Sequence, residues 1–201
     1  MTVLIAVEGI DGAGKTTFIE NLKTRFKEEK QCSVYVQPFP TMNTRYGLQA
    51  RKELAKSDPN YQRIDLLCEA DRAAWVRAYL VPVLYDRFDI IIYDRFSSSG
   101  IAYAYANSNS NSPFYEFVDS KLEIENAKPE IFKPNFTIFI DTPPEEALRR
   151  AIERGKVNDE ADLDIRKQMR AYEVFNSLKD TSWFTEKEIN NQFDTIEWKS
   201  Q

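Results

Sequence analysis

The chain of 201 residues has no histidine, only two cysteines and no long apolar run. Without histidine, an imidazole cannot serve as general acid, general base or metal ligand. The two cysteines, Cys32 and Cys68, come without a secretory leader and therefore predict reduced thiols and a cytoplasmic location. The apolar start, Val3–Val7, is too short for a membrane span or a signal-peptide core. We interpret it as a first strand and expect no membrane association.

The chain also lacks an excess of positive charge. Its formal net charge is −5, from 27 lysines and arginines against 32 aspartates and glutamates spread along the sequence. Nucleic-acid binders gain affinity by neutralising many phosphates, so this balance argues against a nucleic-acid partner. A local cluster of cations can still bind a small polyanionic substrate. With 42% hydrophobic and 29% charged residues, we expect a single globular domain over residues 1–201.

Apolar strand-like runs alternate with helical patterns along the chain. The predicted strands are Val3–Val7, Ser33–Val36, Ile90–Tyr93, Phe136–Ile140 and Thr195–Trp198. The predicted apolar helix faces are Phe18, Ile19, Leu22 and Phe26; Leu66, Leu67, Ala70, Ala74 and Val81; and Ile165, Met169, Tyr172 and Phe175. This alternation predicts a doubly wound α/β fold, with a parallel sheet of about five strands flanked by helices.

Three polar segments directly follow predicted strands: Gly9–Thr16, Asp94–Phe96 and Asp141–Pro144. Ligands of such folds bind at the carboxyl ends of the strands. We therefore expect these three segments to meet at one edge of the sheet and to form the functional site.

The segment Gly9–Thr16 matches the phosphate-loop pattern G-x-x-x-x-G-K-[ST] in full, between a predicted strand and a predicted helix. Its backbone N–H groups and the helix N-terminus suit a triphosphate. Lys15 is predicted to reach the β- and γ-phosphates, and the Thr16 hydroxyl to ligate Mg²⁺. The predicted ATP-binding residues are Gly9, Gly12, Ala13, Gly14, Lys15, Thr16 and Thr17. A GTPase would carry an Asn-Lys-x-Asp segment, which is absent, so a small nucleotide or nucleoside kinase is favoured.

The apolar run Ile90–Tyr93 delivers Asp94 and Arg95 to the same predicted edge. An acid at the end of a buried strand suits a second Mg²⁺-organising group, directly or through water. Arg95 beside it suits bidentate binding of an acceptor phosphate. A salt-bridged surface pair is the plain structural alternative, which the neighbouring phosphate loop makes less favoured.

Taken together, these segments resemble the thymidylate kinase family from Val3 to about Phe175. The matching pieces are Glu8–Thr17; Phe39-Pro40; Leu66-Leu67 with Ala70-Asp71-Arg72; Asp94-Arg95-Phe96 with Ser99–Tyr103; and Lys133-Pro134 leading to Phe139–Glu145 and Arg149-Arg150. The resemblance implies Mg²⁺-dependent transfer of the γ-phosphoryl group of ATP to dTMP, giving dTDP. It also implies a P-loop kinase fold and a homodimer. An acceptor phosphate is mostly ionised near neutral pH, so the reaction needs no histidine base.

The resemblance also assigns roles on the acceptor side. It places Asp11 at the acceptor sugar 3′-hydroxyl, Arg72 at a thymine carbonyl and Arg95 at the acceptor phosphate. Phe96 then helps to exclude a ribose 2′-hydroxyl, and Tyr103 lines the base pocket. The complete predicted acceptor set is Asp11, Phe39, Arg72, Arg95, Phe96, Ser99 and Tyr103.

A charged segment, 149–164, is expected to form a short lid. Family members carry a transition-state arginine either in the phosphate loop or in this lid. Gly12 occupies the loop position, so the resemblance gives the role to Arg150 or Arg154. A solvated helix face is the alternative for the segment. The predicted catalytic residues are Lys15, Asp94, Arg95, Arg150 and Arg154, with Thr16 and Asp94 as the metal ligands.

Two positions depart from the family pattern, both on the acceptor side. Cys68 stands where an aromatic residue often stacks on thymine, and Met42 stands where an arginine often follows the Phe39-Pro40 pair, with Arg45 the nearest substitute. Another or a modified pyrimidine monophosphate therefore remains an alternative acceptor. A deoxynucleoside kinase and a non-catalytic nucleotide-binding protein are rival interpretations of the same motifs. A deoxynucleoside kinase would need a carboxylate base soon after the second strand, and no aspartate or glutamate lies between Ser33 and Lys52.

Overall fold

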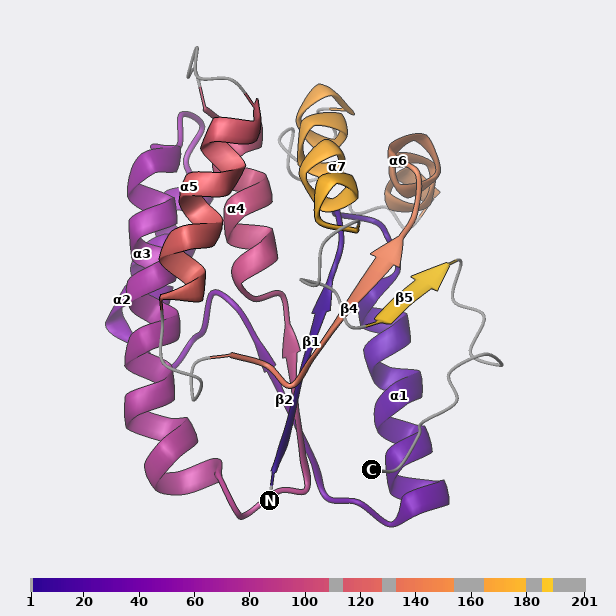
Figure 1. Ribbon diagram of the computed structural model, residues 1–201. Helices are drawn as coiled ribbons and strands as arrows, with labels where there is room; N and C mark the ends of the chain where they lie inside the picture. The colour runs from indigo at the N-terminus through magenta and orange to yellow at the C-terminus, as the bar shows by residue number, and fades with distance from the viewer. Residues whose placement is uncertain (1, 109–113, 128–132, 154–164, 180–185, 190–201) are drawn as a thin grey trace.

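The computed structural model describes residues 2–108, 114–127, 133–153, 165–179 and 186–189. Five strands form one sheet, in the order β2-β3-β1-β4-β5, and every pairing is parallel. The strands are β1 (Val3–Glu8), β2 (Val34–Pro38), β3 (Ile90–Asp94), β4 (Phe136–Asp141) and β5 (Glu186–Ile189). Helices cover the sheet (Figure 1). The predicted doubly wound α/β fold is confirmed.

The described helices lie between these strands. They are α1 (Lys15–Lys30), α2 (Arg45–Leu54), α3 (Tyr61–Trp75), the π-helix η1 (Val76–Leu84), α4 (Ser97–Ala106), α5 (Phe114–Asn126), α6 (Pro144–Glu153) and α7 (Ile165–Lys179). Among the described residues, none of these helices combines the length and the apolar character that a membrane span requires.

Apolar side chains on the two faces of the sheet form two separate clusters. Ile5 and Val7 point into one cluster, with the buried faces of α1, α4 and α7. Leu4 and Ala6 point into the other, with Trp75 and the buried side of η1. Successive residues of a strand face opposite sides, so a central strand buried on both sides must be apolar throughout. This requirement explains the continuous apolar run at Val3–Val7.

The first four predicted strands match the structure within two residues. The fifth, Thr195–Trp198, lies outside the described residues and stays a prediction. The fifth strand of the described sheet is β5, Glu186–Ile189, which the sequence did not predict. This strand reads Glu-Lys-Glu-Ile and pairs with β4 alone, at the edge of the sheet. Sequence periodicity missed it because an edge strand does not need the apolar run of a central one.

The predicted apolar face of α1 is confirmed, since Phe18, Ile19, Leu22 and Phe26 are all buried. The face predicted for the next helix is wrong. Leu66 is 68% exposed and Val81 47% exposed, whereas the buried residues of α3 are Ile64, Asp71, Arg72 and Trp75. The pattern failed here because two charged residues face inward: Arg72 lines a cavity, and Asp71 binds Thr41 and Thr44. In α7 the prediction holds for Phe175, but Met169 is 46% exposed and Gln168 is buried in its place.

Candidate active site

The phosphate loop joins β1 to α1 at the carboxyl edge of the sheet. Gly12 has a φ of 81°, a left-handed conformation that disfavours side chains. A Cβ atom built there would lie 2.2 Å from the Ala147 carbonyl oxygen. The first turn of α6 therefore packs directly against the loop. This contact explains why residue 12 is glycine and why an arginine side chain does not fit at this position of the loop.

Lys15 begins α1 and folds back over the loop. Its Nζ atom donates hydrogen bonds to the carbonyl oxygens of Gly9 at 3.0 Å and Ile10 at 2.7 Å. Burial lowers the pKa of Lys15 to about 8, and the Arg95 charge acts in the same direction, opposed by the charge of Asp11. The ammonium group is thus held at the centre of the loop, where phosphate oxygens would offset its lost hydration. Thr16 and Thr17 follow in the first turn of α1 and are exposed.

Arg95 follows β3 in a left-handed backbone conformation, with a φ of 67°. A non-glycine residue adopts this conformation at a cost and needs support from its surroundings. Three hydrogen bonds supply it: from Arg95 N to Val7 O at 3.0 Å, from Phe39 N to Asp94 O at 3.0 Å, and from Phe96 N to Glu8 Oε1 at 3.0 Å. This turn directs the guanidinium group toward the phosphate loop.

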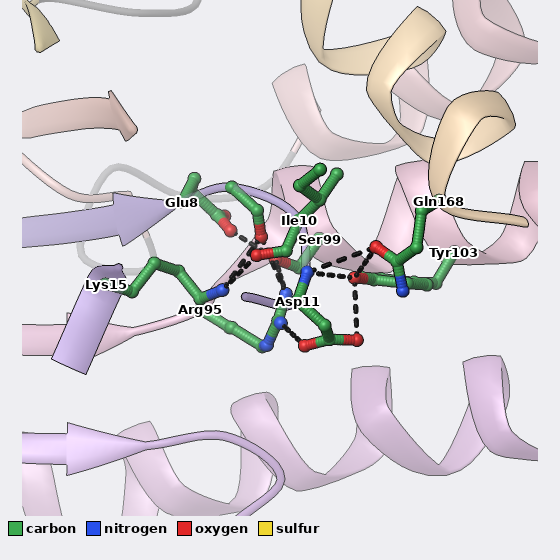
Figure 2. Close-up of polar contacts among 9 residues, drawn as sticks. Glu8, Ile10, Asp11, Lys15, Arg95, Ser99, Tyr103 and Gln168 are labelled. Atoms are coloured by element: carbon green, nitrogen blue, oxygen red, sulfur yellow. Dashed lines mark hydrogen bonds and ion pairs between the residues drawn. The ribbon is translucent and has the colours of Figure 1, made fainter. Parts of the chain in front are cut away.

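The Arg95 guanidinium group bridges the phosphate loop and α4 (Figure 2). Its Nη1 atom donates to Gly9 O at 3.0 Å and to Ser99 Oγ at 3.1 Å, and Nη2 pairs with the Asp11 carboxylate. The guanidinium carbon also lies 5.1 Å from the centre of the Tyr103 ring. The predicted acceptor residues Asp11, Arg95, Ser99 and Tyr103 therefore form one contact network.

Asp11 is the centre of this network. The Tyr103 hydroxyl donates to Asp11 Oδ2 at 2.9 Å, and the Asp11 N–H is shared between the Tyr103 hydroxyl at 3.0 Å and Gln168 Oε1 at 3.2 Å. Burial works to raise the pKa of Asp11, but the charges of Arg95 and Lys15 outweigh it and lower the pKa to about 2. Burial and the Asp11 charge raise the pKa of Tyr103. At neutral pH the pair is thus a carboxylate accepting from a neutral phenol.

Glu8 is a site residue that sequence reasoning assigned no role. It ends β1 and is fully buried, and its carboxylate accepts hydrogen bonds from Phe96 N and from the Ser99 hydroxyl. Burial raises its pKa, while the Ser99 hydrogen bond and the Arg95 charge oppose the shift. A glutamate at the end of a buried apolar strand is the signal that could have found it, because buried charges need partners. Gln168 on α7, whose contact with Asp11 depends on tertiary packing, gave no such signal.

All seven predicted acceptor residues line one cavity of about 310 Å³ beside the phosphate loop. Cys68 lines it too, and burial raises the pKa of this thiol to about 11, so it is neutral at physiological pH. Met42 and Arg45 lie outside the lining. Met42 is 62% exposed, and the Arg45 guanidinium group contacts the neighbouring Tyr46. This geometry therefore does not support the expectation that Arg45 takes the role of the missing arginine.

Arg72 enters the cavity from α3, on which it is buried. Its guanidinium group lies 5.7 Å from the centre of the Phe96 ring, and a Cβ atom built at Gly100 would lie 3.3 Å from its Nη1 atom. Gly100 was given no role from the sequence, and it leaves room for this arginine. The Phe96 ring is itself fixed by stacking on Tyr93, with ring centres 4.8 Å apart.

Asp71 precedes Arg72 and is also fully buried. Its carboxylate accepts hydrogen bonds from Thr41 N and Thr41 Oγ1, both at 2.7 Å, and from the Thr44 hydroxyl. These contacts tie the segment after the Phe39-Pro40 pair to α3. One helix thus offers Arg72 to the cavity and holds the opposite wall in place.

The start of the predicted lid packs on the phosphate loop. Arg150 donates from Nη1 to Ala13 O at 3.3 Å and from Nε to Glu146 Oε1 at 2.7 Å. Arg149 pairs with Glu146 and Glu153 on the exposed side of α6. The other lid candidate, Arg154, lies outside the described residues, as does the rest of segment 149–164 after Glu153. Thr142 donates to Ala13 O at 2.9 Å, so the segment after β4 also reaches the loop.

The oxygen donors near the loop fit a Mg²⁺ ion carried by a nucleotide. Mg²⁺ at phosphate-transfer sites usually takes one or two protein oxygens, with phosphates and water supplying the rest. Thr16 and Asp94 offer a hydroxyl and one carboxylate. Asp94 is close enough for its charge to act on the pKa of Lys15. Among the described residues, no cluster of three or more acidic or cysteine side chains could hold a metal on its own.

Comparison with known proteins places these features in a family. The family model described as Thymidylate kinase matches residues 7–197. A probable thymidylate kinase from Pyrococcus abyssi is 30% identical over 200 residues, covering 96% of this chain and 89% of that protein. One from Archaeoglobus fulgidus is 32% identical over 168 residues, covering 84% and 79%. A thymidylate kinase from Xanthomonas campestris pv. campestris is 36% identical over 154 residues, covering 76% and 62%.

Proposed function

Because the chain belongs to the thymidylate kinase family, we propose that it transfers the γ-phosphoryl group of ATP to dTMP, giving dTDP. The observation that carries this proposal is the cavity beside the phosphate loop, lined by all seven residues expected to bind the acceptor. Its arginines, Arg72 and Arg95, are suited to a base carbonyl and to a phosphate.

The donor triphosphate would lie in the phosphate loop, with Lys15 on its β- and γ-phosphates. Arg95 would bind the acceptor phosphate and bring its oxygen in line with the γ-phosphorus. Its present partner, the Asp11 carboxylate, would then contact the acceptor sugar. Since the attacking phosphate oxygen is already ionised, catalysis rests on positioning and on neutralising the charge that gathers between the two nucleotides.

Thr16 and Asp94 are the residues that would hold Mg²⁺, with the nucleotide phosphates. The ion supplies charge neutralisation at the triphosphate when it is bound. On the opposite side of the loop, Arg150 is held by Ala13 and Glu146 at the start of the proposed lid. It is the described candidate for the transition-state arginine that the Gly12 geometry keeps out of the loop.

A cytoplasmic homodimer completes the proposal. The family resemblance implies pairing through helices, and α3 and η1 carry the exposed apolar side chains Leu66, Val81 and Val83. Such exposed apolar side chains suit a protein interface. Equilibrium sedimentation at micromolar concentration tests it: a dimer is expected, and a monomer at all concentrations would contradict it.

The acceptor panel is the experiment that tests the function. Coupled ADP release is measured with ATP, Mg²⁺ and each of dTMP, dUMP, dCMP, dGMP, AMP and thymidine. The expected result is turnover with dTMP well above the others. Turnover with thymidine but not dTMP would make the protein a nucleoside kinase, and ADP release independent of any acceptor would remove the transfer reaction.

A modified pyrimidine monophosphate is the second candidate acceptor, because Cys68 lines the cavity where an aromatic side chain would restrict the base.

A further inference from the structure

A second cavity, of about 930 Å³, lies beside the acceptor cavity. It is lined by the N-terminal part of α3, the C-terminal part of α4, and side chains of α5 and α7. These helices stand together beyond the carboxyl ends of the strands, with α4 in contact with the other three (Figure 1). The two cavities have a common wall made of Tyr61, Asp65, Ala104 and Asn107. The second cavity therefore adjoins the acceptor site and shares these four lining residues with it.

Cationic side chains outnumber carboxylates in the lining of this cavity, whereas carboxylates outnumber cations in the whole chain. The lining includes four cationic side chains, Lys121, Arg166, Lys167 and Arg170, and two carboxylates, Asp58 and Asp65. The chain as a whole carries a formal charge of −5. A concave surface of one sign raises the local concentration of ligands of the opposite sign. Both substrates of the proposed reaction are polyanions, so the sign of this cavity suits them.

Arg170 and Lys121 are the best-defined cations of the cavity. Arg170 donates both Nη atoms to the Ser108 carbonyl oxygen at 3.2 Å, and its guanidinium carbon lies 4.7 Å from the centre of the Tyr105 ring. These partners are neutral, so they fix the arginine without cancelling its charge. Lys121 pairs with Asp65 on the common wall at 2.6 Å. Glu69 also lies 4.0 Å from Lys121, so carboxylates offset the lysine charge at the common wall, and the positive charge held by neutral partners is that of Arg170 on α7.

We propose that this second cavity is an anion-binding antechamber, which attracts the phosphate of the incoming acceptor nucleotide before that phosphate reaches Arg95. The proposal rests on the proposed function and adds an entry route on the α7 side of the acceptor site. It makes acceptor capture, rather than phosphoryl transfer, sensitive to charge in this cavity. Because the attraction acts through water at the mouth of a cavity, it must weaken as salt is added.

Gln62 provides a test that leaves every cation in place. It lines the cavity, is exposed, and lies one residue inside the start of α3. Gln62→Lys and Gln62→Glu add one charge of either sign. A unit charge about 10 Å from a phosphate dianion in water changes its local concentration roughly threefold at about 0.01 M salt. We expect kcat/KM for dTMP, and the dTMP affinity measured by calorimetry, to rise about threefold in Gln62→Lys and fall about threefold in Gln62→Glu.

The matched control is the same pair of substitutions at Gln31, an exposed residue at the C-terminal end of α1, at the opposite end of the sheet. The proposal requires unchanged kcat in all four variants, little effect at Gln31, and convergence of the Gln62 pair on the wild type at about 1 M salt. Helix stability cannot imitate this result, because an acid near a helix N-terminus stabilises the helix and a base does the reverse.

Two results would overturn the antechamber. One is dTMP capture that is equal in Gln62→Lys, Gln62→Glu and the wild type at low salt. The other is an equal response to the Gln31 pair, which would reflect net charge alone. A wild-type protein that binds ATP but neither binds nor phosphorylates dTMP would instead overturn the proposed function, and the antechamber with it.

Discussion

Replacing Gly12 with alanine tests the packing that separates the phosphate loop from the lid. The new Cβ atom would lie 2.2 Å from the Ala147 carbonyl oxygen and 2.8 Å from its carbonyl carbon, both backbone atoms. Ala147 is itself fully buried, so the contact cannot be relieved by turning a side chain. Either the loop or the first turn of α6 must move.

The expected cost has two parts. A left-handed conformation costs a non-glycine residue about 1–2 kcal/mol, and overpacking a closely packed site costs about 1–3 kcal/mol more. The free energy of unfolding should therefore fall by about 2–5 kcal/mol, or by about 2–4 °C in Tm for each kcal/mol in a chain of this size. Because Arg150 contacts Ala13 from α6, kcat should fall as well.

Urea denaturation followed by tryptophan fluorescence measures the change, and Gly100→Ala is the matched control. Gly100 lies within α4, where a Cβ atom would meet only the end of the Arg72 side chain, at 3.3 Å. Alanine there should not lower the free energy of unfolding, since it favours helix by about 1 kcal/mol over glycine. It should raise KM for dTMP by displacing Arg72. If both variants have the same stability as the wild type, the close approach of α6 to the loop is refuted.

The remaining predictions concern the buried charges of the site. Lys15→Ala should abolish turnover without lowering Tm, because the buried ammonium group opposes folding at neutral pH, and activity like that of the wild type in the same coupled assay would remove Lys15 from the mechanism. The pKa of Lys15 is lowered from 10.5 to about 8 in the folded chain, so kcat/KM for ATP should decline as pH rises above about 8. Between about pH 8 and 10.5, Lys15 is protonated in the unfolded chain but mostly deprotonated in the folded chain. The free energy of unfolding should therefore rise with pH over this range, which denaturation at about pH 7, 9 and 10 can measure. Glu8→Gln keeps the shape of the side chain but gives Phe96 N and the Ser99 hydroxyl only one acceptor oxygen in place of two. KM for dTMP should rise roughly tenfold or more, because a buried hydrogen bond to a charged group contributes about 1.5–3 kcal/mol. An unchanged KM for dTMP would show that Glu8 does not hold the Arg95 turn.

Much of the fold and part of the site could be predicted from the sequence. Central strands buried on both faces must be apolar, and this rule predicted β1, β3 and β4. The phosphate loop follows β1, Asp94 ends β3, and Arg95 comes next. The positions of Asp11, Arg72, Arg95 and Tyr103 around one cavity agree with the family resemblance. Their roles in catalysis stay predictions.

The features that escaped sequence reasoning depend on contacts between distant segments. Asp71 is buried on Thr41 and Thr44, and Arg72 is buried in the acceptor cavity, so a rule that turns charged residues to solvent chose the wrong face of α3. The role of Gly100 depends on Arg72, and that of Gln168 on Asp11, and neither partner is near in sequence. The edge strand Glu186–Ile189 has no apolar run to reveal it.

The most direct test of the proposed reaction is the fate of the transferred phosphoryl group. The protein is incubated with γ-³²P-labelled ATP, Mg²⁺ and dTMP, and the radioactive products are separated by thin-layer chromatography. We predict that the label appears in the β-phosphate of dTDP in step with ADP formation. Label in inorganic phosphate alone, with dTMP unchanged, would contradict the proposed transfer.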